Sequence, residues 1–265
     1  MPLTDFIRYL NARFPSRPRL APPFFHSESG RVLVRYRHLC LESEFLPIVE
    51  TSGGVRGHAA RLLATVENVC RRVDESTVFA LPENSEEFVF VDRLTRTLHT
   101  LNYLTYLDRG SRGLLLLKVH PRHVASVTRN HGLAFEEILC ACGLLPNEIT
   151  LELGAREGDD PKRFLRAIAD YKLRGYGIAL AGGGWHPPSL DRVREAGPTI
   201  VSLAYPRSAE RAKLATIRRY VDALHSMKVS ALVRGEDHPL PRPKILEAGF
   251  DLRTESTQTR LLEAS

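Results

Sequence analysis

With 265 residues, of which 43% are hydrophobic and 26% charged, the chain has the composition of a globular protein and enough length for one barrel domain. It has no apolar run near the ~18 residues of a membrane-spanning helix and no secretory signal pattern, so we expect a cytoplasmic protein without a membrane partner. The 37 basic and 31 acidic residues give a net charge of +6, a mild preference for acidic partners. No Lys/Arg block or basic groove interleaved with aromatic residues indicates nucleic-acid binding.

The first residues predict a short amphipathic helix followed by a linker. Apolar side chains recur at three- and four-residue steps, as on one face of a helix, at Leu3, Phe6, Ile7, Leu10 and Phe14. A proline-rich stretch at 15–23 then breaks regular structure. We therefore predict an arm and linker over residues 1–30 and a domain over residues 31–265. A helix this short is marginal alone, so we expect it to dock on its own chain or on another.

From residue 31, short apolar runs alternate with longer helical patterns, which favours a parallel α/β fold over a sandwich. We expect strands at Val32–Tyr36, Phe45–Val49, Gly113–Val119, Ile149–Leu153, Gly177–Ala181, Thr199–Leu203 and Val229–Arg234. We expect helices at Val55–Arg72, Ser85–Asp108, His131–Cys142, Asp160–Arg174, Ser189–Ala196 and Ala209–Met227.

Several segments, in order along the chain, resemble the EAL domain family of cyclic di-GMP phosphodiesterases. Phe45–Glu50 with Gly53–Gly57 resembles the family's opening strand and turn, and Leu114–Pro121 resembles the strand that carries a metal-binding asparagine. The strongest stretch of resemblance comprises Leu144-Leu145-Pro146, Ile149–Leu153, Asp159-Asp160-Pro161 and Leu173–Leu180. Two later segments resemble the last two strand regions of the family: Val229–Asp237 and Ala248–Asp251. The resemblance spans about residues 42–258. It implies a modified (β/α)8 barrel, here with an N-terminal helical arm, from bacterial cyclic di-GMP signalling.

The resemblance also implies a site that has lost its chemistry. Active EAL enzymes hold two divalent cations at the C-terminal mouth of the barrel, and such hard cations need several carboxylates. The positions that match the family's site are Ala59, Lys118, Glu152, Ala155, Ala181, Gly182, Ser202, Arg234 and Thr254. Only Glu152 keeps the carboxylate of the family, so we expect no catalytic residue, no bound metal and no cofactor.

Three cations, Arg61, Lys118 and Arg234, match positions around the mouth of the barrel. Fixed positive charge there is one way to hold a phosphate-bearing nucleotide without hydrolysing it. The alternative is that Lys118 and Arg234 pair with Glu152 and neighbouring acids.

The resulting hypothesis is a catalytically inactive regulatory protein, in or derived from cyclic di-GMP signalling, that acts through a protein partner or as a homo-oligomer. One alternative is a metal-independent cyclic di-GMP receptor. Another is an active phosphodiesterase whose ligands lie at shifted positions, such as Glu236 or Asp237. A further alternative is an unrelated barrel enzyme.

Other patterns in the sequence do not indicate a binding or metal site. The run Gly182-Gly183-Gly184 lacks the spacing of a phosphate-binding loop, which favours a strand-to-helix connection. The histidines His120, His123 and His186 lack a zinc motif, and Cys140-Ala-Cys142 is not a redox CxxC, so we expect reduced thiols.

Overall fold

The computed structural model of the chain describes residues 3–13, 23–26, 30–106, 113–154, 160–182, 186–204, 211–235 and 242–255. Their contacts form two compact units. The first draws on Met1–Glu44 and Arg61–Ser111, and the second on Phe45–Ala60 and Arg112–Ser265. Strands β3 (Leu39–Glu50) and β4 (Val55–Val66) each contribute residues to both units.

The second unit is an eight-stranded barrel. To β3 and β4 it adds β6 (Leu114–Val119), β7 (Ile149–Gly154), β8 (Gly177–Ala181), β9 (Ile200–Ala204), β10 (Ser230–Arg234) and β11 (Leu252–Thr254). The strands neighbour one another in the order β3-β11-β10-β9-β8-β7-β6-β4, and pairing of β3 with β4 closes the ring. The strands from β4 to β11 pair in parallel, whereas β3 is antiparallel to β11. This confirms the predicted fold class.

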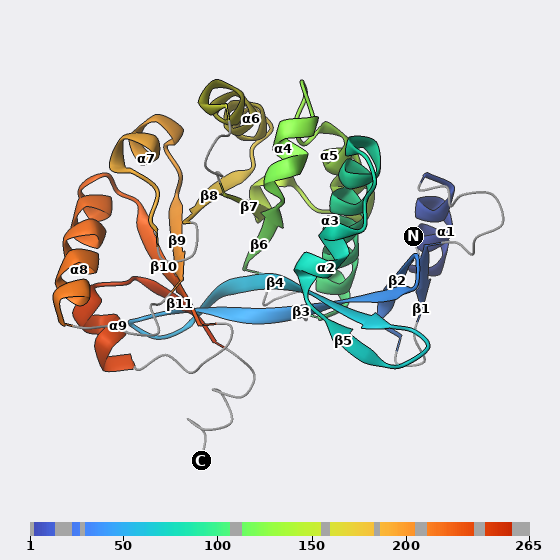
Figure 1. Cartoon of the computed structure of the whole chain (residues 1–265), viewed down its shortest axis with the longest axis horizontal. Coiled ribbons are helices and arrows are strands. Elements are labelled where there is room, and N and C mark those ends of the chain that lie inside the picture. The colour runs from blue at the N-terminus through green and yellow to red at the C-terminus, as the bar shows by residue number, and fades with distance from the viewer. Residues whose placement is uncertain are drawn as a thin grey trace, which may run out of the picture. The chain divides into compact units, whose positions relative to one another are not determined.

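Helices surround the barrel strands in the second unit (Figure 1). They are α4 (Pro121–Ser126), α5 (Leu133–Cys142), the 3-10 turn η1 (Pro146–Glu148), α6 (Pro161–Leu173), α7 (Leu190–Ala196), α8 (Arg211–Ser226) and α9 (Arg242–Ala248). Their starts are marked in the sequence: Asp160 Oδ1 accepts the Lys162 N–H (3.0 Å), and Pro161 occupies the first helical position of α6. Among the described helices, none is both long and apolar enough to cross a bilayer.

The barrel interior is filled by side chains that alternate along each strand, as the period of two requires. Its buried apolar residues are Leu46, Ile48, Ala59, Leu116, Ala179, Ile200, Leu232 and Leu252. They close the barrel to water, so any polar side chain that points inward beside them must find a partner within the protein.

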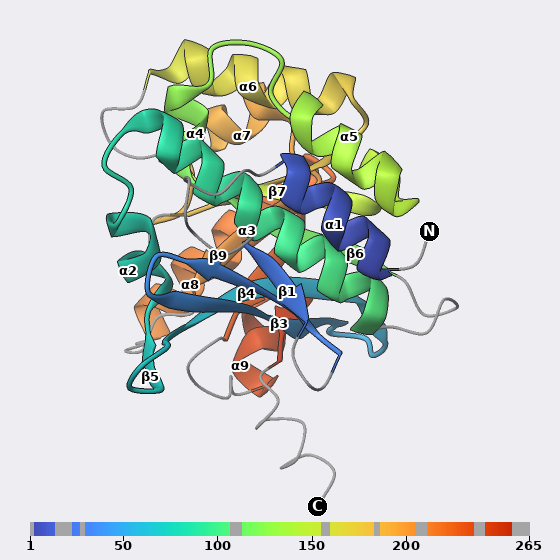
Figure 2. The same ribbon diagram turned by 90° about the vertical axis from the view of Figure 1, so that its right-hand side faces the viewer.

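In its described residues, the first unit combines antiparallel strands with three helices. The strands are β1 (Phe24–His26), β2 (Val32–Tyr36), the first part of β3, the last part of β4 and β5 (Arg71–Val73). The helices are α1 (Leu3–Arg13), α2 (Glu75–Ala80) and α3 (Ser85–Tyr106). Helix α1 packs on β1 and α3 on β2, and Figure 2 shows both helices above these strands.

Helix α3 buries polar side chains that are tied down by specific partners. Asn102 bonds both the N–H and the carbonyl of Val32 (2.9 and 2.8 Å), which fixes the helix to β2. His99 Nδ1 shares a 2.8 Å hydrogen bond with Ser43 Oγ, and burial lowers the pKa of His99 to about 3, so the imidazole is neutral. Asp92 and Arg96 form an ion pair that is 2% exposed on both sides.

The predicted helix at Val55–Arg72 is wrong. The segment forms β4 and then turns into β5. Its residues Gly57, His58 and Ala59 are buried in succession, because a barrel strand is covered on both faces. A strand buried on both faces loses the alternation that distinguishes it from a helix, and the apolar spacing then fits either structure.

The N-terminal helix is present and docks on its own chain. Phe6, Ile7 and Leu10 are buried, while Phe14 lies outside the described residues. Asn11 fixes the contact, because its Nδ2 donates to the carbonyl of Phe24 (3.0 Å) and its Oδ1 accepts the Phe24 N–H (2.9 Å). The same side chain thereby satisfies both backbone groups of a strand residue.

Replacing Asn11 with alanine should lower the free energy of unfolding by about 1–2 kcal/mol, because it leaves the buried backbone groups of Phe24 without partners. Thermal melting at several protein concentrations tests this, since an intrachain contact gives the same loss at each concentration. The matched control is Arg8→Ala, which removes only an exposed ion pair with Asp5 and should cost under about 0.5 kcal/mol. A loss that appears only on dilution would contradict the intrachain contact.

Candidate functional site

The barrel brings together polar side chains from strands that are far apart in the sequence. Lys118, Glu152, Ala181 and Arg234 lie at or within two residues of the C-terminal ends of β6, β7, β8 and β10. Lys118 and Glu152 are direct partners in the β6–β7 register. In (β/α) barrels this end of the strands is where binding and catalytic groups gather.

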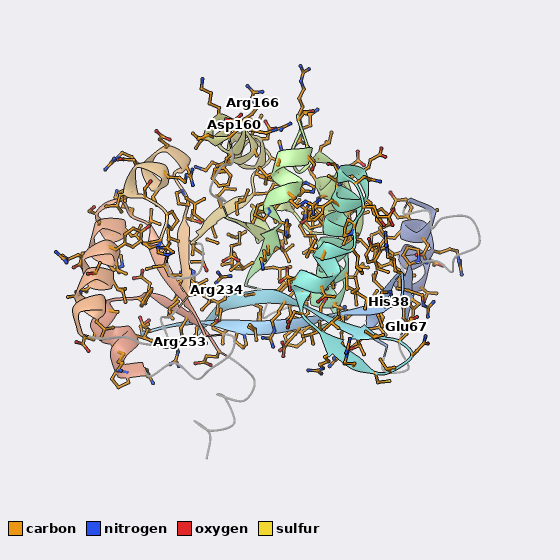
Figure 3. The ribbon with its side chains drawn as sticks, in the orientation of Figure 1. His38, Glu67, Asp160, Arg166, Arg234 and Arg253 are labelled. Atoms are coloured by element: carbon orange, nitrogen blue, oxygen red, sulfur yellow. The ribbon has the colours of Figure 1, made fainter. Side chains whose placement is uncertain are left out.

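An ion pair between Glu152 and Arg234 dominates this mouth. Arg234 Nη1 donates to Glu152 Oε2 at 3.2 Å, although the two residues come from strands separated by β8 and β9 in the barrel order. Figure 3 shows Arg234 among the barrel strands. The side chain of Glu152 is 5% exposed and that of Arg234 19%, so the carboxylate is the more deeply buried partner. The Glu152 carboxylate is thus already occupied by a cation of the protein.

Two buried oxygen atoms in the barrel have no partner among the described residues: the second oxygen of Glu152, Oε1, and the hydroxyl of Ser202. Ser202 lies on β9 and is fully buried. Both atoms are within the barrel, where an unmet hydrogen bond is costly.

The other matched positions offer no ligand for a metal ion. Ala59 and Ala181 carry methyl groups, and Ala59 belongs to the apolar core. Gly182 lies where a Cβ would come within 2.6 Å of the His186 carbonyl oxygen, so the close approach of two backbones requires glycine there. Thr254 Oγ1 accepts the N–H of Gly235 (3.0 Å). Ala155 lies outside the described residues, as do Gly183, Gly184, Glu236 and Asp237.

The remaining two cations differ in their surroundings. Lys118 is exposed on β6. Arg61 belongs to the first unit, where its Nε donates to Glu44 Oε2 at 2.7 Å. No motif in the sequence connects Glu44 with Arg61. Alternation along β3 and β4 from the core residues Leu46 and Ala59 is the signal that could have linked them.

The donor set at the mouth does not fit a two-metal site. Two adjacent dications need several anionic oxygens, and the side chains here supply one carboxylate, held by a guanidinium, beside an ammonium group. Within the described parts of the chain, no cluster of three or more His, Cys, Asp or Glu side chains is arranged to hold a metal ion. Burial also raises the pKa of Cys142 to about 12, which disfavours the thiolate form in which a cysteine binds metal.

Comparison with known proteins gives a likeness in structure alone. No protein-family model and no curated protein matches the sequence. The solved structure of PaMucR phosphodiesterase in complex with c-di-GMP is similar with a TM-score of 0.68 at 15% identity, over 81% of this chain and 88% of that one. A standalone EAL protein from Vibrio cholerae, in its c-di-GMP-bound form, gives 0.65 at 15% identity, over 81% and 89%.

A third similar structure is Klebsiella pneumoniae BlrP1 with FMN and cyclic diGMP and no metal ions. It has a TM-score of 0.57 at 15% identity, over 81% of this chain and 51% of that one. At such identities the likeness establishes the fold. The barrel therefore has the fold of EAL-domain structures.

Proposed function

We propose that this protein is a non-hydrolysing regulatory domain of the EAL type, in or derived from cyclic di-GMP signalling, that acts through contacts with other proteins. The observation that carries the proposal is the ion pair between Glu152 and Arg234. It supports loss of hydrolysis because the guanidinium occupies the carboxylate that a divalent cation would need.

Charge at the mouth of the barrel opposes a two-metal reaction. In-line attack on a phosphodiester by two metal ions requires anionic ligands that offset the repulsion between the ions. At this mouth a protein cation neutralises the carboxylate, and Lys118 adds a second positive charge beside it. A dication approaching these groups is repelled, so we assign no reaction step to a metal.

A second candidate, metal-independent binding of cyclic di-GMP, is favoured by the cations themselves. Lys118 is exposed, and Arg234 retains some contact with solvent. A similar structure, that of Klebsiella pneumoniae BlrP1, contains cyclic diGMP without metal ions. Lysine and arginine are the side chains that bind phosphate groups, so they would supply the charge that a metal supplies elsewhere.

Purified protein is expected to leave cyclic di-GMP intact in the presence of either Mg²⁺ or Mn²⁺. Chromatographic separation of the nucleotide from its linear product measures this, with a bona fide phosphodiesterase as the positive control. Titration calorimetry on the same preparation, with and without metal, separates the two candidates. No binding heat selects action through protein contacts, and binding that needs no metal and disappears in Lys118→Gln selects the receptor.

Metal-dependent turnover would contradict the proposal, provided that the activity persists through purification and is reduced by Glu152→Gln. That result would mean that ligands for the metal come from positions outside the alignment, including the segments beyond the described residues. Turnover that Glu152→Gln does not affect would place the activity in a contaminating enzyme.

A further inference from the structure

Helix α3 is joined to the strands beneath it by a set of buried hydrogen bonds that ends on a histidine. Asn102 bonds the backbone of Val32 on β2, and its Nδ2 also donates to the hydroxyl of Ser43 on β3 (3.3 Å). Ser43 Oγ in turn shares a 2.8 Å hydrogen bond with His99 Nδ1. All four residues belong to the first unit and are at most 8% exposed. We call Val32, Asn102, Ser43 and His99 the α3 network.

The donors and acceptors of the α3 network fix the tautomer of His99. The Val32 N–H can only donate, so Asn102 meets it with its oxygen and meets Ser43 with its NH2 group. Ser43 Oγ therefore accepts from Asn102, and its single hydrogen is left to donate to His99 Nδ1. The imidazole accordingly accepts at Nδ1 and carries its own hydrogen at Nε2.

A second proton on His99 conflicts with this arrangement. At Nδ1 it would meet the Ser43 hydroxyl, which must then turn its own hydrogen away from the acceptor that the network gives it. It would also put a positive charge on a residue that is 5% exposed. Burial lowers the pKa of His99 to about 3, in agreement with this geometry.

The surroundings of His99 do not offset such a charge. Burial is the cause of its lowered pKa, so among the described residues no charged side chain acts on the imidazole. Tyr103, one helical turn further along α3, is a buried phenol and not a carboxylate. Alternation along β3 places Glu42 and Glu44 on the opposite face of the strand from Ser43. Charged and titratable side chains on the elements around α3 are engaged in the pairs Asp92–Arg96, Arg31–Glu42, Arg61–Glu44, Arg35–Glu67, Tyr36–Glu87 and Asp5–Arg8.

We propose that the α3 network is an acid-sensitive contact: protonation of His99 disrupts it and releases this part of α3 from β2 and β3. The proposal goes beyond the cyclic di-GMP chemistry of the barrel and does not depend on it. In the released state the imidazole is hydrated and has its ordinary pKa of about 6.5, so this state takes up the proton that the docked state refuses. The stability of the docked state is therefore complete above about pH 6.5 and is lost as the pH falls below that value.

Hydrogen exchange of the full chain, followed by mass spectrometry at about pH 7.5 and about pH 5.0, tests this contact. Both values lie above the range in which ordinary carboxylates titrate. After correction for intrinsic exchange rates, protection of the α3 amides at residues 98–103 should fall about thirtyfold, as expected when the pKa of one histidine drops from 6.5 to about 3 on docking. Protection of β8 should change by less than about threefold, because His99 belongs to the other unit.

Two variants of the α3 network and one control identify the group that titrates. His99→Gln keeps an acceptor for the Ser43 hydroxyl but takes up no proton, so protection of α3 should change by less than about threefold between the two pH values. Ser43→Asp places a carboxylate against Nδ1, which favours the imidazolium, so protection should stay constant or rise at the lower pH. A general loss of stability does not reverse the sign in this way. His38→Gln, at an exposed histidine in the turn between β2 and β3, should keep the thirtyfold loss.

The proposal is overturned if protection of α3 in the unmodified protein is independent of pH, if His99→Gln keeps the thirtyfold loss, or if β8 loses protection equally. Nitrogen-15 spectra of the imidazole at neutral pH give an independent check, because the α3 network requires the hydrogen of His99 at Nε2. A hydrogen at Nδ1 would mean that Ser43 accepts from both neighbours. Protonation would then leave the α3 network intact, and this result too would overturn the proposal.

Discussion

Replacing Asp92 with alanine is expected to destabilise the protein by about 3–5 kcal/mol, because it leaves the guanidinium of Arg96 buried without its carboxylate. Arg96 donates to Asp92 Oδ2 through both Nε (3.1 Å) and Nη2 (2.7 Å), and each side chain is 2% exposed. Removing a charge in water costs little, whereas a charge stranded in the interior cannot recover its hydration. Urea unfolding measured by circular dichroism gives the change in free energy.

Two controls make the cause identifiable. The double variant Asp92→Leu with Arg96→Met should recover most of the loss, since apolar groups of similar volume replace a buried ion pair at little cost. Asp222→Ala breaks a pair with Arg218 at the same four-residue spacing, but there both partners are about half exposed. It should change stability by less than about 1 kcal/mol. Equal losses in the buried and exposed pairs would contradict the role of burial.

The barrel strands were the part of the fold that the sequence predicted best. Leu114–Leu117 is a continuous apolar run, which is the pattern of a parallel strand covered on both faces, whereas Ile149–Leu153 alternates apolar and polar residues with the period of a strand. The structure places β6 and β7 there, with ends within one residue of the prediction. The same burial on both faces explains the failure at Val55–Arg72, where small and polar residues interrupt the run and a helical spacing fits.

The short elements of the first unit escaped the sequence for a different reason. Strands β1 and β5 have three residues each and are defined by their pairing with β2 and β4. A three-residue strand has no period to detect, so only its partner reveals it. Helix α3 was found, because 22 residues suffice to show their helical character even though the polar His99 and Arg96 are buried.

At the mouth of the barrel, the sequence supplied the residues but not their contacts. Glu152, Lys118 and Arg234 were singled out through the resemblance to a family, which aligns strand ends that meet in space. The sequence does not decide whether Arg234 binds a ligand or pairs with Glu152. The ion pair joins residues 82 positions apart, and only closure of the barrel brings these atoms together.

Breaking this ion pair from its two sides should have unequal effects. Arg234→Gln leaves a 5% exposed carboxylate without its guanidinium and should cost about 3–5 kcal/mol. Glu152→Gln leaves a guanidinium that is 19% exposed and reaches water, so the cost should be nearer 1–3 kcal/mol. Urea unfolding of both variants and of the double variant Glu152→Leu with Arg234→Met measures the asymmetry, and the double variant should lie close to the unmodified protein.

The control for general charge loss is Arg56→Gln, whose pair with Glu50 in the same unit is exposed and should contribute less than about 1 kcal/mol. If Arg234→Gln also costs less than that, Glu152 reaches solvent in the variant and the mouth is open enough to hydrate a carboxylate. Such a mouth could equally admit a hydrated cation, and this outcome would contradict the proposed loss of metal-dependent hydrolysis. A large, asymmetric loss would instead mean that Arg234 is the permanent counter-ion of the buried Glu152 carboxylate.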